Sequence, residues 1–254
     1  MVSARIPALS LMATAFLALA APFARAQLTF PAPAPPVANL TPEQKGDIFM
    51  ARKMYREAIE TYSGVKPMTA VLWDKIGISY HQLGDLNAAK KCYERAIRVD
   101  KKYADAINNV GTVYYAQKKY RSAIAAYLKA LRISPDSASA WSNLGTAYYA
   151  RKRFDEMTKA YTKALELDPG VFDQHGAVGT RMEDRSVEDR ARYHFEMAKM
   201  YATAGKNDMA LQYLRKALEE GLKDKDKVIQ AKEFTTLRET QEFKDLMAAE
   251  PRVL

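Results

Sequence analysis

A period of 34 residues dominates the sequence between positions 70 and 171. Three successive segments, 70–103, 104–137 and 138–171, place the same kinds of residue at the same positions. The eighth residue of each is a glycine: Gly77, Gly111 and Gly145. A repeat of this length, with apolar residues at helical spacing, predicts stacked pairs of helices.

The recurring residues have distinct physical roles in such a pair. Trp141, Leu144 and Tyr148 are spaced three and four residues apart and therefore lie on one face of a helix. Small residues such as Gly145 allow two helix backbones to approach closely. Pro135 closes one segment because proline cannot continue a helix interior. One pair cannot bury its apolar stripe alone, so neighbouring pairs must stack.

In these columns the sequence resembles the tetratricopeptide repeat family. The resemblance implies an all-α fold, a right-handed α-solenoid of stacked helix-turn-helix repeats, and a role in protein binding. We expect one weak and three strong repeats in 41–171, a loop interruption at 172–190, a degenerate hairpin at 191–221, and C-terminal capping helices at 222–254. The run from residue 184 to 221 also resembles the end of bacterial members of the family.

Met157 departs from the repeat pattern, because it stands in a column that Ala89 and Ala123 otherwise fill. A long side chain there is expected to widen the hairpin. The sequence therefore predicts that Met157→Ala leaves thermal stability unchanged or raises it.

The N-terminus has the features of an export signal. An apolar stretch from about Ala8 to Phe23 follows Arg5. The next residues, Ala24, Arg25 and Ala26, fit cleavage after Ala26, because small residues stand at the third and first positions before the cut. We expect a signal peptide at 1–26, a proline-rich tether at 27–40, and a protein exported to the periplasm or secreted from a bacterial envelope. A permanent membrane anchor is the alternative.

The single cysteine, Cys92, excludes an internal disulfide. We expect it to be a small packing residue, with a redox or intermolecular role as the alternative.

No catalytic or cofactor site is predicted. The histidines, His81, His175 and His194, lack the spacing of a metal site, and no glycine-rich phosphate loop is present. The sequence therefore favours a protein that is not an enzyme and has no cofactor or metal. Nucleic acid is not expected as a partner, because of export and the absence of a recognition motif.

A partner-binding groove is implied by the family resemblance, in which the first helix of each hairpin lines the concave side. The residues expected to contact a peptide or partner helix of another protein are Asp74, Ile78, His81, Asn108, Asn109, Thr112, Tyr115, Ser142, Asn143, Thr146 and Tyr149. Asn109 and Asn143 match a family asparagine that can grip a peptide backbone. The family's lysine clamp for a terminal carboxylate is absent. A solvated face without a ligand, or one used for self-association, is the alternative.

A second candidate surface is a basic edge. Residues 70–171 contain 17 basic and 10 acidic side chains, and much of the excess falls in two hairpin turns. These turns contribute Lys118, Lys119, Arg121, Arg151, Lys152 and Arg153. Such runs usually keep a surface solvated. The alternatives are adhesion to an anionic membrane or glycan and a homo-oligomeric structural subunit.

Overall fold

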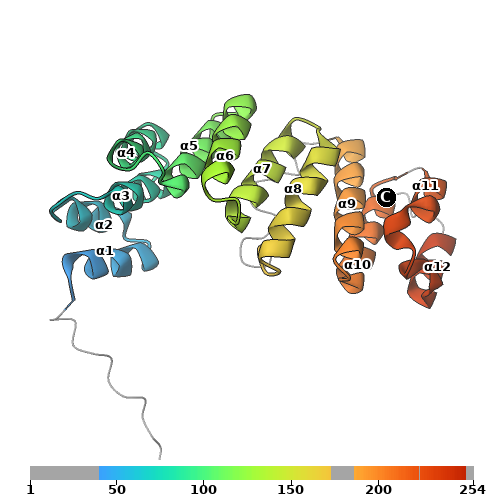
Figure 1. The fold of residues 1–254 in the computed structure, drawn as a ribbon. Helices are drawn as coiled ribbons and strands as arrows, with labels where there is room; N and C mark the ends of the chain where they lie inside the picture. Colours follow the sequence, from blue (N-terminus) through green and yellow to red (C-terminus); the bar gives the residue numbers. More distant parts are fainter. Residues whose placement is uncertain (1–39, 173–185, 223, 250–254) are drawn as a thin grey trace, which may run out of the picture. The chain divides into compact units, whose positions relative to one another are not determined.

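The structure is a computed structural model that describes residues 40–172, 186–222 and 224–249. All regular elements in these ranges are helices (Figure 1). They are α1 (Pro42–Ala51), α2 (Tyr55–Ser63), α3 (Ala70–Gln82), α4 (Leu86–Val99), α5 (Ala104–Ala116), α6 (Tyr120–Ile133), α7 (Ala138–Ala150), α8 (Phe154–Leu167), α9 (Val187–Thr203), α10 (Asn207–Glu219), α11 (Lys225–Gln230), η3 (Lys232–Phe234), η4 (Leu237–Glu239) and α12 (Gln241–Ala248).

The helices from α1 to α10 form five hairpins, each made of an odd-numbered and the following even-numbered helix. The second helix of each hairpin also packs on the first helix of the next, and the first helices of neighbouring repeats touch along α3, α5 and α7. This arrangement is the predicted all-α solenoid of helix-turn-helix repeats. The expected signal peptide, the tether up to residue 39, and most of the loop interruption lie outside the described residues.

A glycine and a tyrosine lock each of the first four hairpins. A Cβ atom added to Gly111 would lie 2.6 Å from Cε1 of Tyr127, so only glycine leaves room for the ring. The pairs Gly46–Tyr62, Gly77–Tyr93 and Gly145–Tyr161 repeat this contact. In the fifth hairpin Ala198 and Leu214 hold the same two positions, and both are buried. A larger residue on the first helix is thus matched by a smaller one on the second.

The turns inside the hairpins share one left-handed residue. Gly84 and Gly205 adopt a φ of 81° and 71° there. Lys53, Lys118 and Lys152 occupy the equivalent position at 60°, 59° and 58°. The position thus recurs with the repeat, and in three of these turns a lysine adopts a conformation that glycine adopts more easily.

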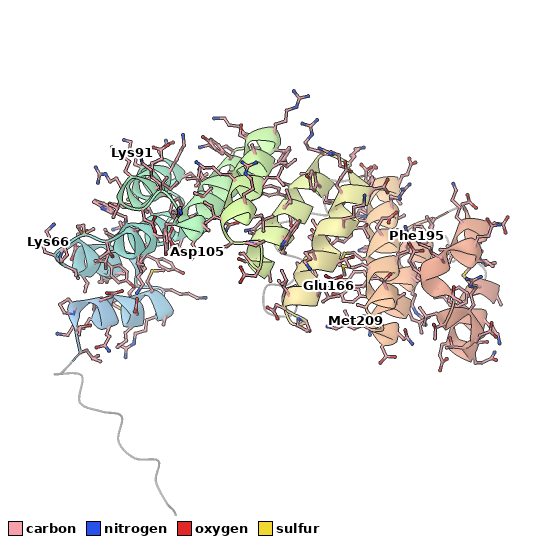
Figure 2. The ribbon with its side chains drawn as sticks, in the orientation of Figure 1. Lys66, Lys91, Asp105, Glu166, Phe195 and Met209 are labelled. Carbon is pink, nitrogen blue, oxygen red and sulfur yellow. The ribbon has the colours of Figure 1, made fainter. Side chains whose placement is uncertain are left out.

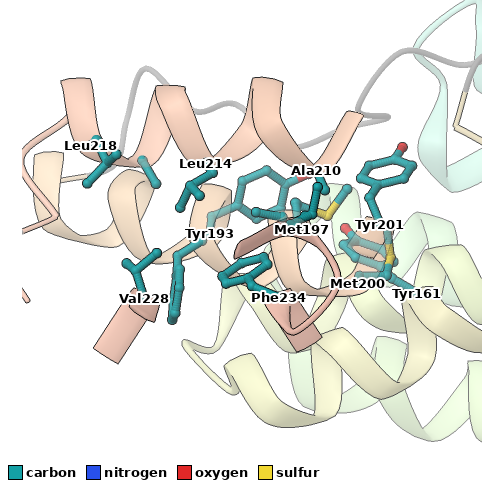
Figure 3. Packing of buried hydrophobic residues seen from close by; sticks show 14 of the residues in the cluster. Tyr161, Tyr193, Met197, Met200, Tyr201, Ala210, Leu214, Leu218, Val228 and Phe234 are labelled. Atoms are coloured by element: carbon teal, nitrogen blue, oxygen red, sulfur yellow. The ribbon is translucent and has the colours of Figure 1, made fainter. Parts of the chain in front are cut away.

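The C-terminal helices pack against α9 and α10. Figure 3 shows Val228 and Phe234 packed with Tyr193 and Leu214 in one apolar cluster. Ile229, next to the buried Val228, is exposed. Two 3₁₀ turns separate α11 from α12, so the segment is not made of continuous α-helix alone.

Met157 corrects the sequence-based expectation for its column. Its side chain is fully buried and belongs to the cluster that contains Tyr149, Tyr161 and Tyr193. It therefore fills space between the third full repeat and α9. The repeat register is nevertheless as predicted, because Gly145 faces Tyr161.

Gly111→Ala tests the glycine–tyrosine contact. Overpacking a core lowers the free energy of unfolding by about 1–3 kcal/mol. The better helix propensity of alanine offsets about 1 kcal/mol of this loss. We expect Gly111→Ala to lower the free energy of unfolding, and Tyr127→Leu in the same chain to remove the added penalty. Chemical denaturation of both single variants and the double variant would measure a favourable coupling between the sites. Simple additivity would contradict the contact.

Met157→Ala is now expected to lower the free energy of unfolding by about 2–5 kcal/mol, because it leaves a cavity in a packed core. Met54→Ala, at an exposed position, is the control and should change stability by about 0.5 kcal/mol or less. Equal effects of the two substitutions in chemical denaturation would show that Met157 does not fill the core.

Candidate partner-binding face

The first-helix face consists of the residues of α3, α5 and α7 that the sequence predicts to line a groove, together with Val71 and Asp105, the second residues of their repeats. Its polar side chains bond to one another across repeats. Nδ2 of Asn109 donates to Oδ1 of Asp74 at 3.0 Å, which joins α5 to α3. Nδ2 of Asn143 donates to Oδ1 of Asn108 at 3.1 Å, which joins α7 to α5.

These bonds change the role expected for Asn109 and Asn143. The sequence predicted amides that grip a partner's backbone, but one donor of each amide is already used between repeats. The fifth residue of one repeat pairs with the sixth of the next, so the bonds set the register of neighbouring first helices. We call these paired side chains the polar row.

Lys75 extends the polar row towards the N-terminus. Its Nζ atom lies 2.8 Å from Oε1 of Glu43 and 2.7 Å from Oδ1 of Asp47, both on α1. The hydroxyl of Tyr62 also donates to Asp47 at 2.6 Å. Burial would raise the pKa of Asp47, but the hydrogen bonds from Lys75 and Tyr62 lower it on balance. The sequence analysis missed this cluster, although the sixth-position column already contained Lys75.

The two threonines of the face serve their own hairpins. The hydroxyls of Thr146 and Tyr161 lie 3.0 Å apart, and Thr146 is buried. The hydroxyl of Tyr127 lies 3.5 Å from Oγ1 of Thr112. The same tyrosine rings pack against the glycines, so the threonines help to hold the two helices of a hairpin together. Thr146 was predicted to contact a partner, but it is buried and therefore cannot do so.

Tyr149 is not at an open surface. Only 1% of it is exposed, and the prediction that it lines an open groove is wrong. Its ring lies 4.7 Å from that of Tyr193 on α9 and 6.0 Å from that of Phe154. The cause is α9, which packs over this end of α7 and covers the column that His81 and Tyr115 begin.

The accessible part of the face lies on α3, α5 and the first turns of α7. Val71 is 41% exposed, and Ile78, His81 and Tyr115 are half-buried. Asp105 is exposed at the start of α5 (Figure 2). Ser142 on α7 is also half-buried. Burial lowers the pKa of His81, which favours the neutral imidazole at neutral pH. This surface offers apolar, aromatic and neutral polar groups, with the carboxylate of Asp105 at its edge.

Family models match the chain at the same positions as the hairpins. One described as "TPR repeat" matches residues 77–118 and 111–152. Two described as "Tetratricopeptide repeat" match residues 138–171 and 191–220. These stretches are tetratricopeptide repeats. None of the curated proteins compared with the chain matches it significantly.

Several solved structures are similar to the chain at low sequence identity. A crystal structure of MamA is 23% identical, covers 71% of this chain and 96% of its own, and has a TM-score of 0.47. The MamA RS-1 ArsTM double mutant is 19% identical, with coverages of 70% and 92% and a TM-score of 0.48. The second TPR domain of human RPAP3, in complex with an HSP70 peptide, is 23% identical, covers 42% and 92%, and has a TM-score of 0.39.

The last tetratricopeptide hairpin adds a charged cluster that the sequence analysis missed. Glu196 of α9 is buried, and its carboxylate accepts bonds from Arg192 at 3.1 Å, Lys199 at 2.9 Å and Thr158 at 3.2 Å. Glu196 occupies the sixth position of its repeat, as Asn143 does in the preceding one. The sixth position of the repeat could therefore have indicated a polar contact here. The partners of Glu196 differ from those of Asn143, because they lie on α9 itself and on α8.

The predicted basic edge is only partly free. Lys118, Lys119, Arg121, Arg151, Lys152 and Arg153 are all exposed. Nζ of Lys152, however, lies 2.7 Å from the carboxylate of Asp189 on α9. Arg153 pairs with Glu156 and stacks 4.7 Å from the ring of Tyr148. The turn between α7 and α8 therefore contributes less uncompensated charge than the sequence indicated.

Within the described ranges, no group of His, Cys, Asp and Glu is arranged to hold a metal ion. None of the described helices has the length and hydropathy of a membrane span. Cys92 is buried, in agreement with a packing role, and burial raises the pKa of its thiol. Nδ1 of His194 lies 2.6 Å from Glu220, a contact that ties α9 to the end of α10.

Asp74 gives the face a testable pH dependence. The residue is 4% exposed, and burial raises its pKa to about 6. The hydrogen bond from Asn109 lowers the pKa in part, and the negative charge of Asp105 raises it further. The unfolded value is about 3.9. Between about pH 4 and pH 6 the native protein therefore holds a proton on Asp74 that the unfolded chain has lost. The free energy of unfolding falls as the pH rises through this range, because the native protein must then carry a buried charge.

We expect Asp74→Asn to raise the free energy of unfolding at neutral pH by about 2 kcal/mol. The gain should disappear as the pH falls from 6 towards 4. Chemical denaturation across this range measures it, with Asp136→Asn, at an exposed position between α6 and α7, as the control that changes little. A gain that does not depend on pH would contradict the assignment to Asp74.

Proposed function

We propose that the chain is a non-catalytic protein-binding scaffold of the cell envelope. It binds a peptide or a helix of another protein along the first-helix face of α3 and α5. The bound segment ends near α7, where α9 covers Tyr149. The observation that carries the proposal is the series of tetratricopeptide repeats, which indicates a protein-interaction scaffold.

The exposed side chains of the face support an extended or helical protein ligand. Val71 and Ile78 provide apolar contacts, and Tyr115 provides an aromatic ring with a polar tip. Aromatic side chains with some polar character are common anchors in protein interfaces. Lys75 is held by Glu43 and Asp47, so it is poorly placed to clamp a carboxylate.

The polar row supports binding at low ordering cost. The bonds Asn109–Asp74 and Asn143–Asn108 fix α3, α5 and α7 relative to one another before a partner arrives. A surface that is already ordered loses less conformational freedom on binding and retains more of the interaction energy as affinity.

The envelope location rests on the export signal expected at residues 1–26. Fractionation of the native host with an antibody to the protein tests it. The protein should appear in the periplasmic or extracellular fraction, with residues 1–26 absent from its N-terminal peptide. A full-length cytosolic form would contradict the location without affecting the binding face.

Site-specific photo-crosslinking tests the binding face. A photoreactive residue at Val71 or Tyr115 should capture the same protein from native envelopes, because both positions lie on the first-helix face. The control is Leu167, a 37% exposed residue at the end of the second helix α8. Equal capture of the same protein at Leu167 would contradict binding at the first-helix face.

Self-association is the other outcome that this experiment can give. If the captured protein is a second copy of the chain, light scattering of the purified protein should show a mass that rises with concentration. That result would replace a foreign partner with a homo-oligomer at the same face.

A further inference from the structure

The second helix of the middle repeat carries positive charge without a counter-charge. Residues 106–135 contain five basic side chains and no Asp or Glu. The five are Lys118, Lys119, Arg121, Lys129 and Arg132, and all are exposed. Among the described residues, no ion pair involves any of them.

These cations gather on one side of α6. The exposed positions of α6 lie on a single helical face by their spacing, and they are Arg121, Ser122, Ala125, Leu128, Lys129 and Arg132. Leu128 is 37% exposed between the charges. The opposite side of α6 is buried in the stack, so the face cannot rotate away. We call this face, with Lys118 and Lys119 of the adjoining turn, the α6 basic face.

The neighbouring second helices each contain a carboxylate that pairs with one of their cations. On α4, Lys90 lies 3.4 Å from Glu94, and on α8, Lys163 lies 3.0 Å from Glu166. Figure 1 shows α6 between these two helices in chain order. What distinguishes residues 106–135 is that this stretch, which includes α6 and one of the two turns that the sequence indicated, contains no carboxylate side chain.

We propose that the α6 basic face docks on an anionic lipid surface. The helix is about 21 Å long at 1.5 Å per residue, so its cations can reach a plane together. Lysines and arginines near such a surface gain attraction additively and need no pocket. An exposed leucine among cations is the kind of side chain that enters the headgroup boundary.

An acidic protein segment fits the α6 basic face less well. Protein interfaces depend on aromatic or aliphatic anchors that fill well-packed pockets. The described residues of this face offer only Leu128 and Ala125 as apolar groups, and the others are flexible cations and Ser122. The proposal is independent of the proposed function, because α6 is a second helix and the first-helix face belongs to α3, α5 and α7.

Vesicle sedimentation tests the docking. The full chain should bind vesicles of phosphatidylglycerol and phosphatidylcholine, release at high salt, and ignore vesicles of phosphatidylcholine alone. The triple variant Lys118→Gln, Lys119→Gln and Arg121→Gln should lower the partition coefficient by about 100-fold, from about 1 kcal/mol for each cation at the surface. Its thermal unfolding should match the wild type, because the three side chains are exposed.

The matched control is Arg52→Gln, Lys53→Gln and Arg56→Gln in the first hairpin. These cations are exposed, lie around the equivalent turn, and include the same left-handed lysine position. The control should keep wild-type vesicle binding. Equal losses in the two triple variants would overturn a surface centred on α6, as would undiminished binding of the Lys118 triple variant. Binding of a DNA oligonucleotide that displaces the vesicles would overturn the lipid assignment.

Discussion

The fold depends on the contact between a glycine in the first helix of a hairpin and a tyrosine ring in the second. In each of the first four hairpins a glycine of the first helix faces a tyrosine of the second, as Gly111 faces Tyr127. The contact brings the two helices close and leaves the remaining apolar side chains to pack between hairpins. The tyrosine hydroxyl then reaches polar groups on the first helix, as Tyr62 reaches Asp47 and Tyr161 reaches Thr146. Closure of the hairpin and the chemistry of the first-helix face are thus linked through one ring.

The polar row determines how one hairpin meets the next. Apolar stacking alone tolerates sliding, whereas Asn109 and Asn143 each find an acceptor on the preceding first helix. At α9 the pattern changes, because Glu196 is held within its own hairpin and by Thr158. The change coincides with the apolar cover over Tyr149. The result is a face that is accessible on α3 and α5 and closed at the far end of α7.

The repeat architecture could be predicted from the sequence because each column reports the same local contact several times. Gly77, Gly111 and Gly145 are informative together, although one glycine means little. The state of Tyr149 and Met157 could not be predicted, because both depend on how α9 packs after a break in the period. The hydrogen-bond partners of Asn109 and Asn143 could not be predicted for another reason. Their partners stand 35 residues away, one more than the period, so Asp74 and Asn109 fall in neighbouring columns.

The central claim is that the accessible face ends where α9 covers α7. Hydroxyl-radical footprinting of the unmodified protein tests it directly, because Tyr115 and Tyr149 occupy the same position in neighbouring repeats. Mass spectrometry should find Tyr115 oxidised readily and Tyr149 protected until the chain unfolds. Oxidation of Tyr149 in the folded protein as fast as that of Tyr115 would contradict the account.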